Sequence, residues 1–551
     1  MQFRFGDTVI HPAEPTQCPD CRMLIRVCNR NENNLYRNTS AKSQKPIISI
    51  YAKEPLWGDP YKVYTQEEWN ADSFDATVYA REFNFSRPFF EQFSELSKAV
   101  PHMAVVTVSN ENCDYTTGTG YCKNCYLINS SEYCEDCYYG KLYQKCTDVM
   151  DSAYMYDCEL CYDCFSLHGC TRCTSVSFSK NSHDCLFSSY LQGCKNCCLC
   201  TNLTQKEYYF QNKPLSKEEY EKRVNEIRGS HSMFQAMKNE MRAMLQQKIW
   251  KYGNIINSQD CTGDYIENSR NCRDCYDTNE SEDCRYVQVG VNVKDLQHCS
   301  NMYLKPELCY ETLGTIEAYN CAYCLYVFHS QNMLYSEHCY TCHDCFGCSG
   351  LRRKQFCIFN KQYTKEEYEV LVPKIIEHMK TDQRSEALNP SPEASGSWGR
   401  FFPPHLSAFG YNESVAQEYA PLMKEEAVKR GFLWRDLKDD APQVSKTLQA
   451  SDLPDSIDDC ADAITDQAVS CTKTGRPFRI LKKELEFYKA QGIPLPRLHP
   501  AVRYEERMRV RNPRKLWNRE CAKCQKPIET TFAPERAEVV LCEECYLKEV
   551  Y

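Results

Sequence analysis

The stretch that decides the fold reads CKNCYLINSSEYCEDC at residues 122–137, and its pattern continues to residue 203. Every third residue from Cys122 to Leu203 is uncharged, whereas every Lys, Glu and Asp lies at one of the other two positions. Cysteine also returns at intervals of twelve, in one column that begins at Cys122 and in another that begins at Cys125. Neither the period of a strand nor that of a helix fits this pattern.

A repeat of twelve built from triplets predicts a narrow coil with four inward-facing positions per turn. Stacked coils would lie about 4.8 Å apart, the spacing of paired strands, so each inward side chain would sit over its counterpart one turn away. Small, uncharged residues are expected inside because so narrow a core cannot solvate charge. The pattern resembles the twelve-residue β-solenoids of insect antifreeze proteins in architecture, and the resemblance implies nothing about ice.

The cysteine pattern restarts further along the chain, with Cys261 placed 148 residues after Cys113. Both copies end alike, in NKPLSKEEY at residues 212–220 and in NKQYTKEEY at residues 360–368. Each ending contains a capping box, which predicts a helix after each copy. The triplet pattern of the second copy slips between Met302 and Cys309, which predicts a longer coil or a looped-out residue.

Two CxxC pairs near the C-terminus have the spacing of a zinc ribbon. They are Cys521, Cys524, Cys542 and Cys545. Four thiolates predict a closed, tetrahedral and structural zinc site with no open position for a catalytic water.

The N-terminal region contains a second copy of this ribbon without its cysteines. The sequence QKPI follows the first pair in both copies, at residues 44–47 and 525–528. The ligand positions of the N-terminal copy hold Ser40, Ser43, Thr65 and Glu68. Hydroxyls do not replace thiolates as structural zinc ligands, so we expect no metal there.

Two further sites retain half of their ligands. Cys18 and Cys21 have no second CxxC near them, and Cys471 pairs with His499 in the corresponding C-terminal arrangement. We expect both to be metal-free remnants, although Cys18 and Cys21 could find partners in three dimensions.

The cysteines of the repeats allow three interpretations. Adjacent coils would bring two sets of four sulfurs near one another, which are Cys122, Cys125, Cys134 and Cys137, and Cys158, Cys161, Cys170 and Cys173. These sets could bind zinc or iron–sulfur clusters. Alternatively they form a ladder of buried thiols, because Ser182 and Val149 replace cysteine in the columns and a thiol packs as a small hydrophobe. Disulfides are the third possibility.

A basic segment precedes the C-terminal ribbon and predicts either nucleic-acid contact or a solvated helix face. The candidate nucleic-acid-binding residues are Arg507, Arg509, Arg511, Arg514 and Lys515.

Composition limits the remaining possibilities. The net charge of −9 gives no global attraction to nucleic acid or membranes. No apolar run reaches the length of a membrane span, and the first residues do not form a signal peptide. The sequence therefore predicts a cytoplasmic protein whose 38 cysteines stay reduced or bind metal, with a secreted disulfide protein as the alternative. It contains no P-loop, dinucleotide fingerprint, HExxH or nucleophile elbow, which predicts that it is not an enzyme.

The predicted fold is mainly β, with two tandem Cys-rich β-solenoids of about twelve residues per coil. The predicted segments are a degenerate zinc-ribbon-like module (1–70), an adaptor that caps the first solenoid (71–112), a first solenoid (113–212), a helical linker (213–256), a second solenoid (257–363), a helix (364–382), a linker and extended wrapping segment (383–465) and the C-terminal zinc-ribbon module (466–551).

The C-terminal part resembles zinc-ribbon domains through LEFY at residues 485–488 and LPR at residues 495–497. The whole chain is similar to large, uncharacterised Cys-rich zinc-ribbon proteins of small-genome bacteria, which share the order of ribbons and Cys repeats. The resemblance implies an architecture and no activity. We expect a non-enzymatic zinc-binding scaffold for a protein partner. The alternatives are a nucleic-acid or ribosome-associated protein and a metal-storage or iron–sulfur redox protein; the partner's identity and the oligomeric state stay open.

Overall fold

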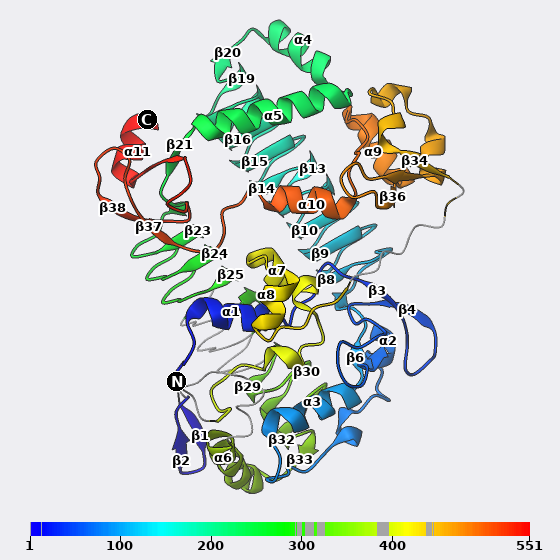
Figure 1. The fold of residues 1–551 in the computed structure, drawn as a ribbon, viewed down its shortest axis with the longest axis vertical. Helices are drawn as coiled ribbons and strands as arrows, with labels where there is room; N and C mark the ends of the chain where they lie inside the picture. Colours follow the sequence, from blue (N-terminus) through cyan, green and yellow to red (C-terminus); the bar gives the residue numbers. More distant parts are fainter. Residues whose placement is uncertain are drawn as a thin grey trace. The chain divides into compact units, whose positions relative to one another are not determined.

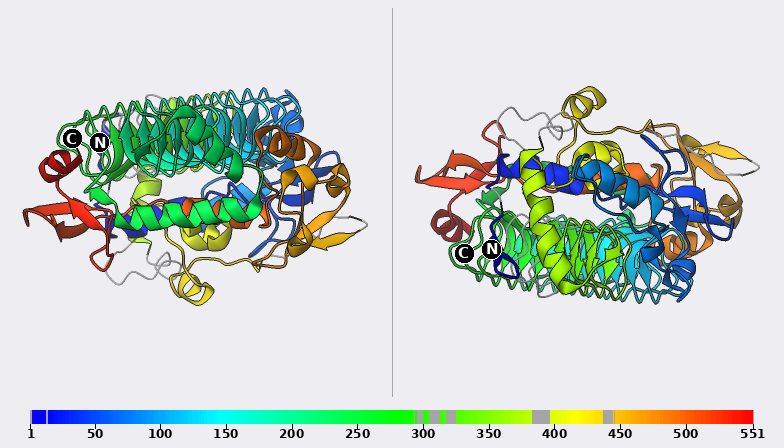
Figure 2. Two further views of the ribbon diagram at one scale, coloured as in Figure 1. Left: turned by 90° about the horizontal axis from the view of Figure 1, so that it is seen from above. Right: turned by 90° about the horizontal axis from the view of Figure 1, so that it is seen from below.

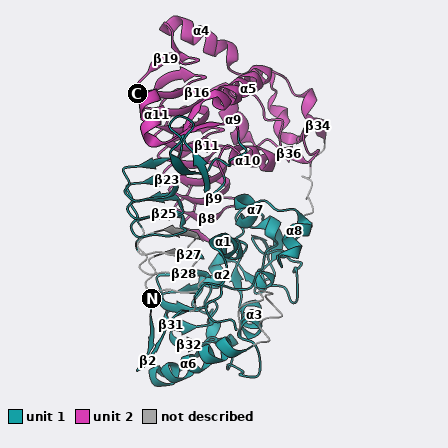
Figure 3. Cartoon of the chain, turned by 60° about the vertical axis from the view of Figure 1, so that its left-hand side comes forward, with its two compact units in different colours: residues 1–105, 251–435, 513–536 teal, residues 106–250, 436–512, 537–551 magenta. Residues whose placement is uncertain are grey.

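The computed structural model describes residues 2–12, 14–292, 294, 300–303, 313–316, 325–382, 396–436, 444 and 446–550. Strands account for 32% and helices for 26%, which confirms a mainly β chain. The chain divides into two compact units (Figure 3): the first unit comprises residues 1–105, 251–435 and 513–536, and the second comprises residues 106–250, 436–512 and 537–551. Among the described helices, none combines the length and apolar character that crossing a bilayer requires.

Parallel strands with a constant offset of twelve residues build the first Cys-rich repeat, residues 107–210, in the second unit (Figure 1), and a short antiparallel strand at residues 213–214 closes it. Tyr138 lies opposite Tyr126, and Val149 lies opposite Cys161. The strands are β7 (Thr107–Val108), β8 (Thr117–Gly120), β9 (Tyr126–Glu132), β10 (Tyr138–Gln144), β11 (Thr147–Met150), β12 (Ala153–Tyr156), β13 (Glu159–Tyr162), β14 (Phe165–His168), β15 (Thr174–Lys180), β16 (Leu186–Gln192), β17 (Lys195–Cys198), β18 (Thr201–Thr204), β19 (Glu207–Phe210) and β20 (Lys213–Pro214).

Two rows of strands run side by side in this repeat and join at the long strands. β10 pairs with both β11 and β12, and β15 pairs with both β13 and β14. Since β11 pairs with β13 and β12 with β14, six parallel strands form a closed ring. Figure 2 shows successive turns of the repeat lying against one another.

The backbone of the repeat has a period of three. The residue before each inward position is left-handed, with φ of 54° at Tyr121, 52° at Asn124 and 50° at Leu127. This conformation costs L-residues about 1 kcal/mol each. Each such residue donates its N–H to the preceding turn, as Asn124 does to the carbonyl of Glu111 at 3.0 Å. The ladder therefore offsets the strain, and the triplet is a structural step as well as a sequence pattern.

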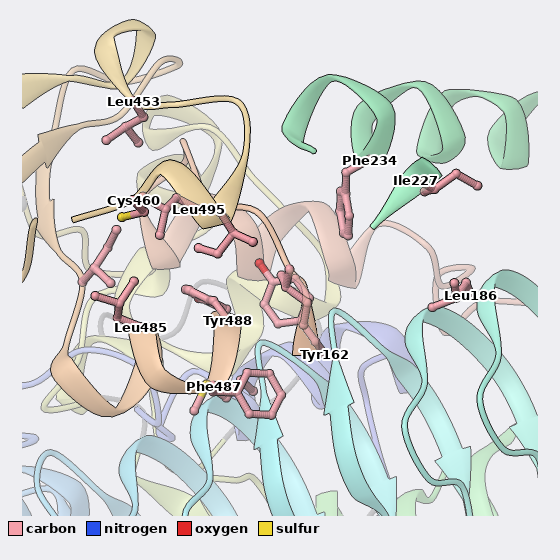
Figure 4. Packing of buried hydrophobic residues seen from close by; sticks show 14 of the residues in the cluster. Tyr162, Leu186, Ile227, Phe234, Leu453, Cys460, Leu485, Phe487, Tyr488 and Leu495 are labelled. Atoms are coloured by element: carbon pink, nitrogen blue, oxygen red, sulfur yellow. The ribbon is translucent and has the colours of Figure 1, made fainter. Parts of the chain in front are cut away.

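The second unit has two hydrophobic cores. The first is the inward row of the repeat itself, in which Cys137, Val149 and Cys161 are fully buried. The second lies on the outside of the repeat, where α4 (Lys217–Ile227), α5 (His231–Gln247) and α9 (Lys482–Gln491) cover its strands (Figure 4). Ser216 caps α4 by accepting a hydrogen bond from the Glu219 N–H, which is one half of the predicted capping box; the Glu219 carboxylate accepts from Arg223 instead of from the Ser216 N–H.

The second Cys-rich repeat, residues 255–362, belongs to the first unit. Its pairing offset is eleven residues at Ile255 and Ile266, twelve afterwards, and thirteen at Ser300 and Leu313. The predicted slip is thus one extra residue in one turn, although residues 304–312 lie outside the described part. The strands are β22 (Ile255–Ile256), β23 (Gly263–Glu267), β24 (Cys275–Asn279), β25 (Gln288–Val291), β26 (Ser300–Tyr303), β27 (Leu313–Ile316), β28 (Leu325–Phe328), β29 (Gln331–Leu334), β30 (Cys339–Tyr340), β31 (His343–Phe346), β32 (Gln355–Ile358) and β33 (Lys361–Gln362). The helix α6 (Lys365–Thr381) follows, with the predicted capping box.

The segment expected to cap the first repeat, residues 71–112, ends in β7, which pairs with β8 of that repeat, whereas its earlier part contacts the second repeat. Phe89, in α3 (Phe89–Ala99), has its ring 5.3 Å from that of Phe359, and the Arg81 N–H donates to the Phe359 carbonyl at 3.0 Å. These contacts cover backbone groups at the last turn, which would otherwise be open. The sequence indicated that the end of a repeat needs a cap. It did not indicate that most of this segment packs on the second repeat.

The remaining described elements of the first unit are short. They are β1 (Phe3–Phe5), β2 (Thr8–Ile10), α1 (Pro19–Val27), β3 (Tyr36–Thr39), β4 (Pro46–Ser49), β5 (Val63–Tyr64), α2 (Gln66–Asn70), β6 (His102–Met103), α7 (Val415–Tyr419) and α8 (Lys424–Lys429). The last two lie in the segment predicted to be an extended linker, of which residues 383–395 and 437–443 fall outside the described part.

Candidate metal centre

The C-terminal module is a hairpin followed by a strand and a helix. Strands β37 (Trp517–Glu520) and β38 (Pro527–Thr530) pair antiparallel, and β39 (Val539–Leu541) leads into α11 (Glu543–Val550). Cys521 donates its N–H to the carbonyl of Lys526 at 2.9 Å, and Gln525 closes the turn with φ of 63°. This turn places the first CxxC pair at the tip of the hairpin and the second at the start of the helix.

The four predicted ligands meet at this point. The sulfurs of Cys521, Cys524, Cys542 and Cys545 all lie within 4.8 Å of one another, and only Cys524 is exposed. A tetrahedral metal with metal–sulfur bonds of about 2.3 Å needs sulfurs about 3.8 Å apart, so the set fits a metal ion after a small contraction. All four donors come from the protein, which leaves no position for substrate or water.

The N-terminal copy has the same hairpin, and hydrogen bonds connect the four positions that correspond to the cysteines. Gln44 has φ of 60°, and Ser40 donates its N–H to the Lys45 carbonyl at 2.9 Å. The Ser40 hydroxyl donates to the Glu68 carboxylate at 2.5 Å, and Glu68 forms a capping box with Thr65. Burial raises the pKa of Glu68, but hydrogen bonds from Ser40, Ser43 and the Thr65 N–H outweigh it and hold that pKa below its ordinary value. Ser40, Ser43, Thr65 and Glu68 thus lie together, and the Glu68 carboxylate accepts hydrogen bonds from the other three residues.

A third copy of the hairpin lies in the second unit, between β35 (Ala468–Ser470) and β36 (Pro477–Arg479). Cys471 donates its N–H to Arg476 at 2.9 Å, and Gly475 has φ of 69°. The helix α10 (Pro500–Met508) begins at His499, whose N–H hydrogen-bonds the Cys471 sulfur. Burial raises the pKa of Cys471, but this contact and those from residues 473 and 474 lower it overall. Cys471 and His499 thus lie side by side, but through the His499 backbone; the His499 ring instead accepts a hydrogen bond from the Ala501 N–H at 3.1 Å.

Cys18 and Cys21 lie at the start of α1, and both are exposed. In the described part of the chain, the only cluster compact enough to hold a metal is the C-terminal one, so these two cysteines gain no further ligands there.

The cysteines of the first repeat are neighbours without forming such a cluster. In the first set, Cys122 contacts Cys125 and Cys134, and Cys137 contacts the same two thiols, so the four form a square. The turn spacing of about 4.8 Å fixes two sides of that square and holds its diagonals apart. Neither this set nor Cys158, Cys161, Cys170 and Cys173 meets the compactness of the C-terminal centre within the described residues.

The inward thiols instead hydrogen-bond the backbone. Cys158 donates to the Tyr156 carbonyl at 3.2 Å, and Cys161 donates to the Glu159 carbonyl at 3.3 Å. Ser182 makes the same bond to Lys180 at 2.9 Å. Serine and cysteine therefore perform one structural task, which explains why they alternate in the columns. No disulfide occurs among the described cysteines.

The basic segment is largely internal. The buried Arg507 lies 3.4 Å from both Asp151 and Asp163, and Arg514 lies 2.8 Å from Asp277. Arg511 lies over the ring of Tyr154 at 5.3 Å and Lys515 over that of Trp517, also at 5.3 Å. Arg509 is exposed and lies 3.9 Å from Glu505. Of the five predicted nucleic-acid contacts, Arg509 and Lys515 thus remain at the surface.

Sequence reasoning missed the acidic partners of these arginines. Asp151 and Asp163 occupy equivalent left-handed positions of adjacent turns, with φ of 50° and 55°, so their side chains are neighbours on the outside of the repeat. The available signal was their separation of twelve residues.

No family model, curated protein or solved structure matches this chain.

Proposed function

We propose that this chain is a non-enzymatic zinc-binding scaffold, in which two tandem β-solenoids with twelve residues per turn offer their faces to a protein partner. The convergence of four cysteine sulfurs in the C-terminal module carries the proposal. Zinc prefers such a donor set, and a site that the protein fills completely is structural. The twelve-residue pairing offset supports the solenoid interpretation.

The alternatives receive less support. A metal-storage or iron–sulfur protein needs sets of cysteines in the repeats that converge as the C-terminal four do, and within the described residues no such set occurs in the repeats. A nucleic-acid protein needs exposed cations, whereas Arg507 and Arg514 are buried beside carboxylates.

Elemental analysis of protein purified without air tests the proposal. We expect about one zinc per chain and a colourless solution. Four or more metal ions per chain, or a brown sample, would overturn it in favour of metal storage. Copurified RNA that high salt removes would favour the nucleic-acid alternative.

A further inference from the structure

A cavity of about 400 Å³ lies within the second unit, away from the metal centre. Its walls come from α5, the end of β13, α10 and the segment 494–498. Figure 4 shows Phe234, Tyr162 and Leu495 reaching this region from three different parts of the chain. The volume lies within the range of small-molecule sites, which is about 300–1,000 Å³.

The lining of the cavity is strongly basic. Its carboxylates are Asp163 and Glu506. Its cationic side chains are Lys238, Arg242, Lys473, Arg497, Arg503 and Arg507. Asp151 and Glu484, which lie outside the lining, pair with Arg503 and Arg507 and reduce this excess of positive charge. The positive charge that remains in the partly enclosed space raises the local potential, because low-dielectric walls focus the field.

The two carboxylates are already engaged by other lining residues. Asp163 lies 2.7 Å from the Lys238 ammonium and 3.4 Å from Arg507, and Glu506 pairs with Lys473. By contrast, Arg242 donates to the Asn239 amide oxygen and Arg497 to the Leu453 carbonyl. Within the described residues, neither of these two arginines pairs with a carboxylate. Their charges are available to a ligand.

Buried N–H groups lie at the same cavity. Arg503 and Arg507 are 8% and 4% exposed, and Nε of both has no hydrogen-bond acceptor among the described residues. Nη2 of Arg503 makes no hydrogen bond there either, although it lies 3.6 Å from the Glu484 carboxylate. Leaving charged donors buried without acceptors costs about 1–3 kcal/mol each. An anion in the cavity would supply the missing acceptors.

We propose that this cavity binds a small organic phosphate with a flat ring, of the nucleoside monophosphate class. Arginine is suited to phosphate because its planar fork donates two parallel hydrogen bonds. The rings of Phe234 and Tyr162 offer apolar contact to the base. The phosphate therefore faces Arg242 and Arg497, and the ring lies toward the aromatic wall.

Isothermal titration calorimetry on the full-length protein tests this proposal, with AMP, GMP, CMP and UMP as ligands and adenosine as the unphosphorylated comparison. We expect saturable binding of at least one nucleotide, and an affinity for adenosine at least about tenfold lower than for AMP. Binding should weaken as salt concentration rises. The combined substitution Arg242→Gln and Arg497→Gln should weaken binding by about tenfold or more.

Arg172→Gln is the matched control, because Arg172 is an exposed arginine on the first repeat that pairs with Asp184. It removes one positive charge outside the cavity, against two in the cavity variant, and should bind as the wild type does. The proposal is overturned if no nucleotide binds at millimolar concentration, if adenosine binds as tightly as AMP, or if Arg172→Gln weakens binding as much as the cavity variant.

Discussion

Gly140 is one of the inward-facing residues of the first repeat, and we expect Gly140→Ala to lower the stability of the protein strongly although it adds a single methyl group. Gly140 lies in β10, and a Cβ atom there would lie 2.0 Å from Cζ and Oη of Tyr143. The Tyr143 side chain is fully buried, and its hydroxyl accepts a hydrogen bond from the Ser152 N–H at 2.8 Å. An added methyl group must displace this ring and break that hydrogen bond.

The magnitude follows from these two consequences. Overpacking a well-filled core costs about 1–3 kcal/mol. A buried N–H left without an acceptor costs about 1–3 kcal/mol more. The variant should therefore lose about 2–6 kcal/mol of unfolding free energy, which lowers the melting temperature of a unit of this size by about 5–20 °C.

Differential scanning calorimetry of the full-length protein measures this effect, with Gly120→Ala as the control. Gly120 lies in the same repeat, but a Cβ atom there would meet its nearest neighbours at 3.8 Å, an ordinary contact. This control should change stability by less than about 1 kcal/mol. In a Tyr143→Leu background, Gly140→Ala should cost much less than in the wild type. Equal melting temperatures for the two glycine variants would refute the packing described for the row.

Three further predictions concern the metal centre, its N-terminal counterpart and the basic segment. Cys542→Ser should abolish metal binding, whereas Cys158→Ser should leave the metal content unchanged; elemental analysis that found a loss in both would assign metal to the repeat as well. The pKa of Glu68 is lower in the folded protein than its ordinary value of 4.5. The ionised carboxylate therefore stabilises the fold fully above about pH 4.5, and this stabilisation is lost as the pH falls through the folded pKa. Glu68→Gln should make the melting temperature less dependent on pH below about 4.5. An unchanged acid dependence in that variant would contradict the role of Glu68. Arg507→Gln should destabilise the protein by about 1.5–3 kcal/mol, because it removes one of the two cations beside each of Asp151 and Asp163 and leaves Arg503 and Lys238 in place, while Arg509→Gln should have almost no effect in thermal unfolding.

The sequence predicted the repeat well because its pattern is a direct consequence of the coil. An inward position in a narrow core tolerates only small, uncharged groups. The twelve-residue spacing of Cys134 and Cys146 therefore identifies both as inward positions. The left-handed residue before each inward position was less visible. Asn and Asp favour that conformation, but Tyr133 and Leu142 also adopt it, and their side chains carry no such preference.

The metal centre was predictable because its ligands are neighbours in sequence. The acidic partners of the basic segment were not, because Asp151 and Arg507 are 356 residues apart. A run of arginines looks the same in sequence whether it faces solvent or carboxylates. The packing of α3 on the second repeat was hidden for the same reason, since a row of phenylalanines indicates burial but does not identify the surface that buries it.

Three copies of one hairpin share the same tight turn, in which Ser40, Cys471 and Cys521 all donate their N–H across the turn. The turn therefore forms with or without four cysteines. What differs is the link from the hairpin to the following helix. A Ser40–Glu68 hydrogen bond forms this link in one copy and a contact to the His499 N–H forms it in another. Each is worth about 1–3 kcal/mol, against more than 10 kcal/mol for a structural zinc site.

The burial of the following helices explains why a weak link is sufficient in two copies and not in the third. The helix of the N-terminal copy buries Trp69, which is 1% exposed, and that of the third copy buries Arg503 and Arg507 against the first repeat. These helices are held by their surroundings. In α11, by contrast, the described residues after Cys545 are half-buried or exposed, and Leu547 is 46% exposed. The four thiolates are therefore retained in the copy whose helix has the least packing to replace them.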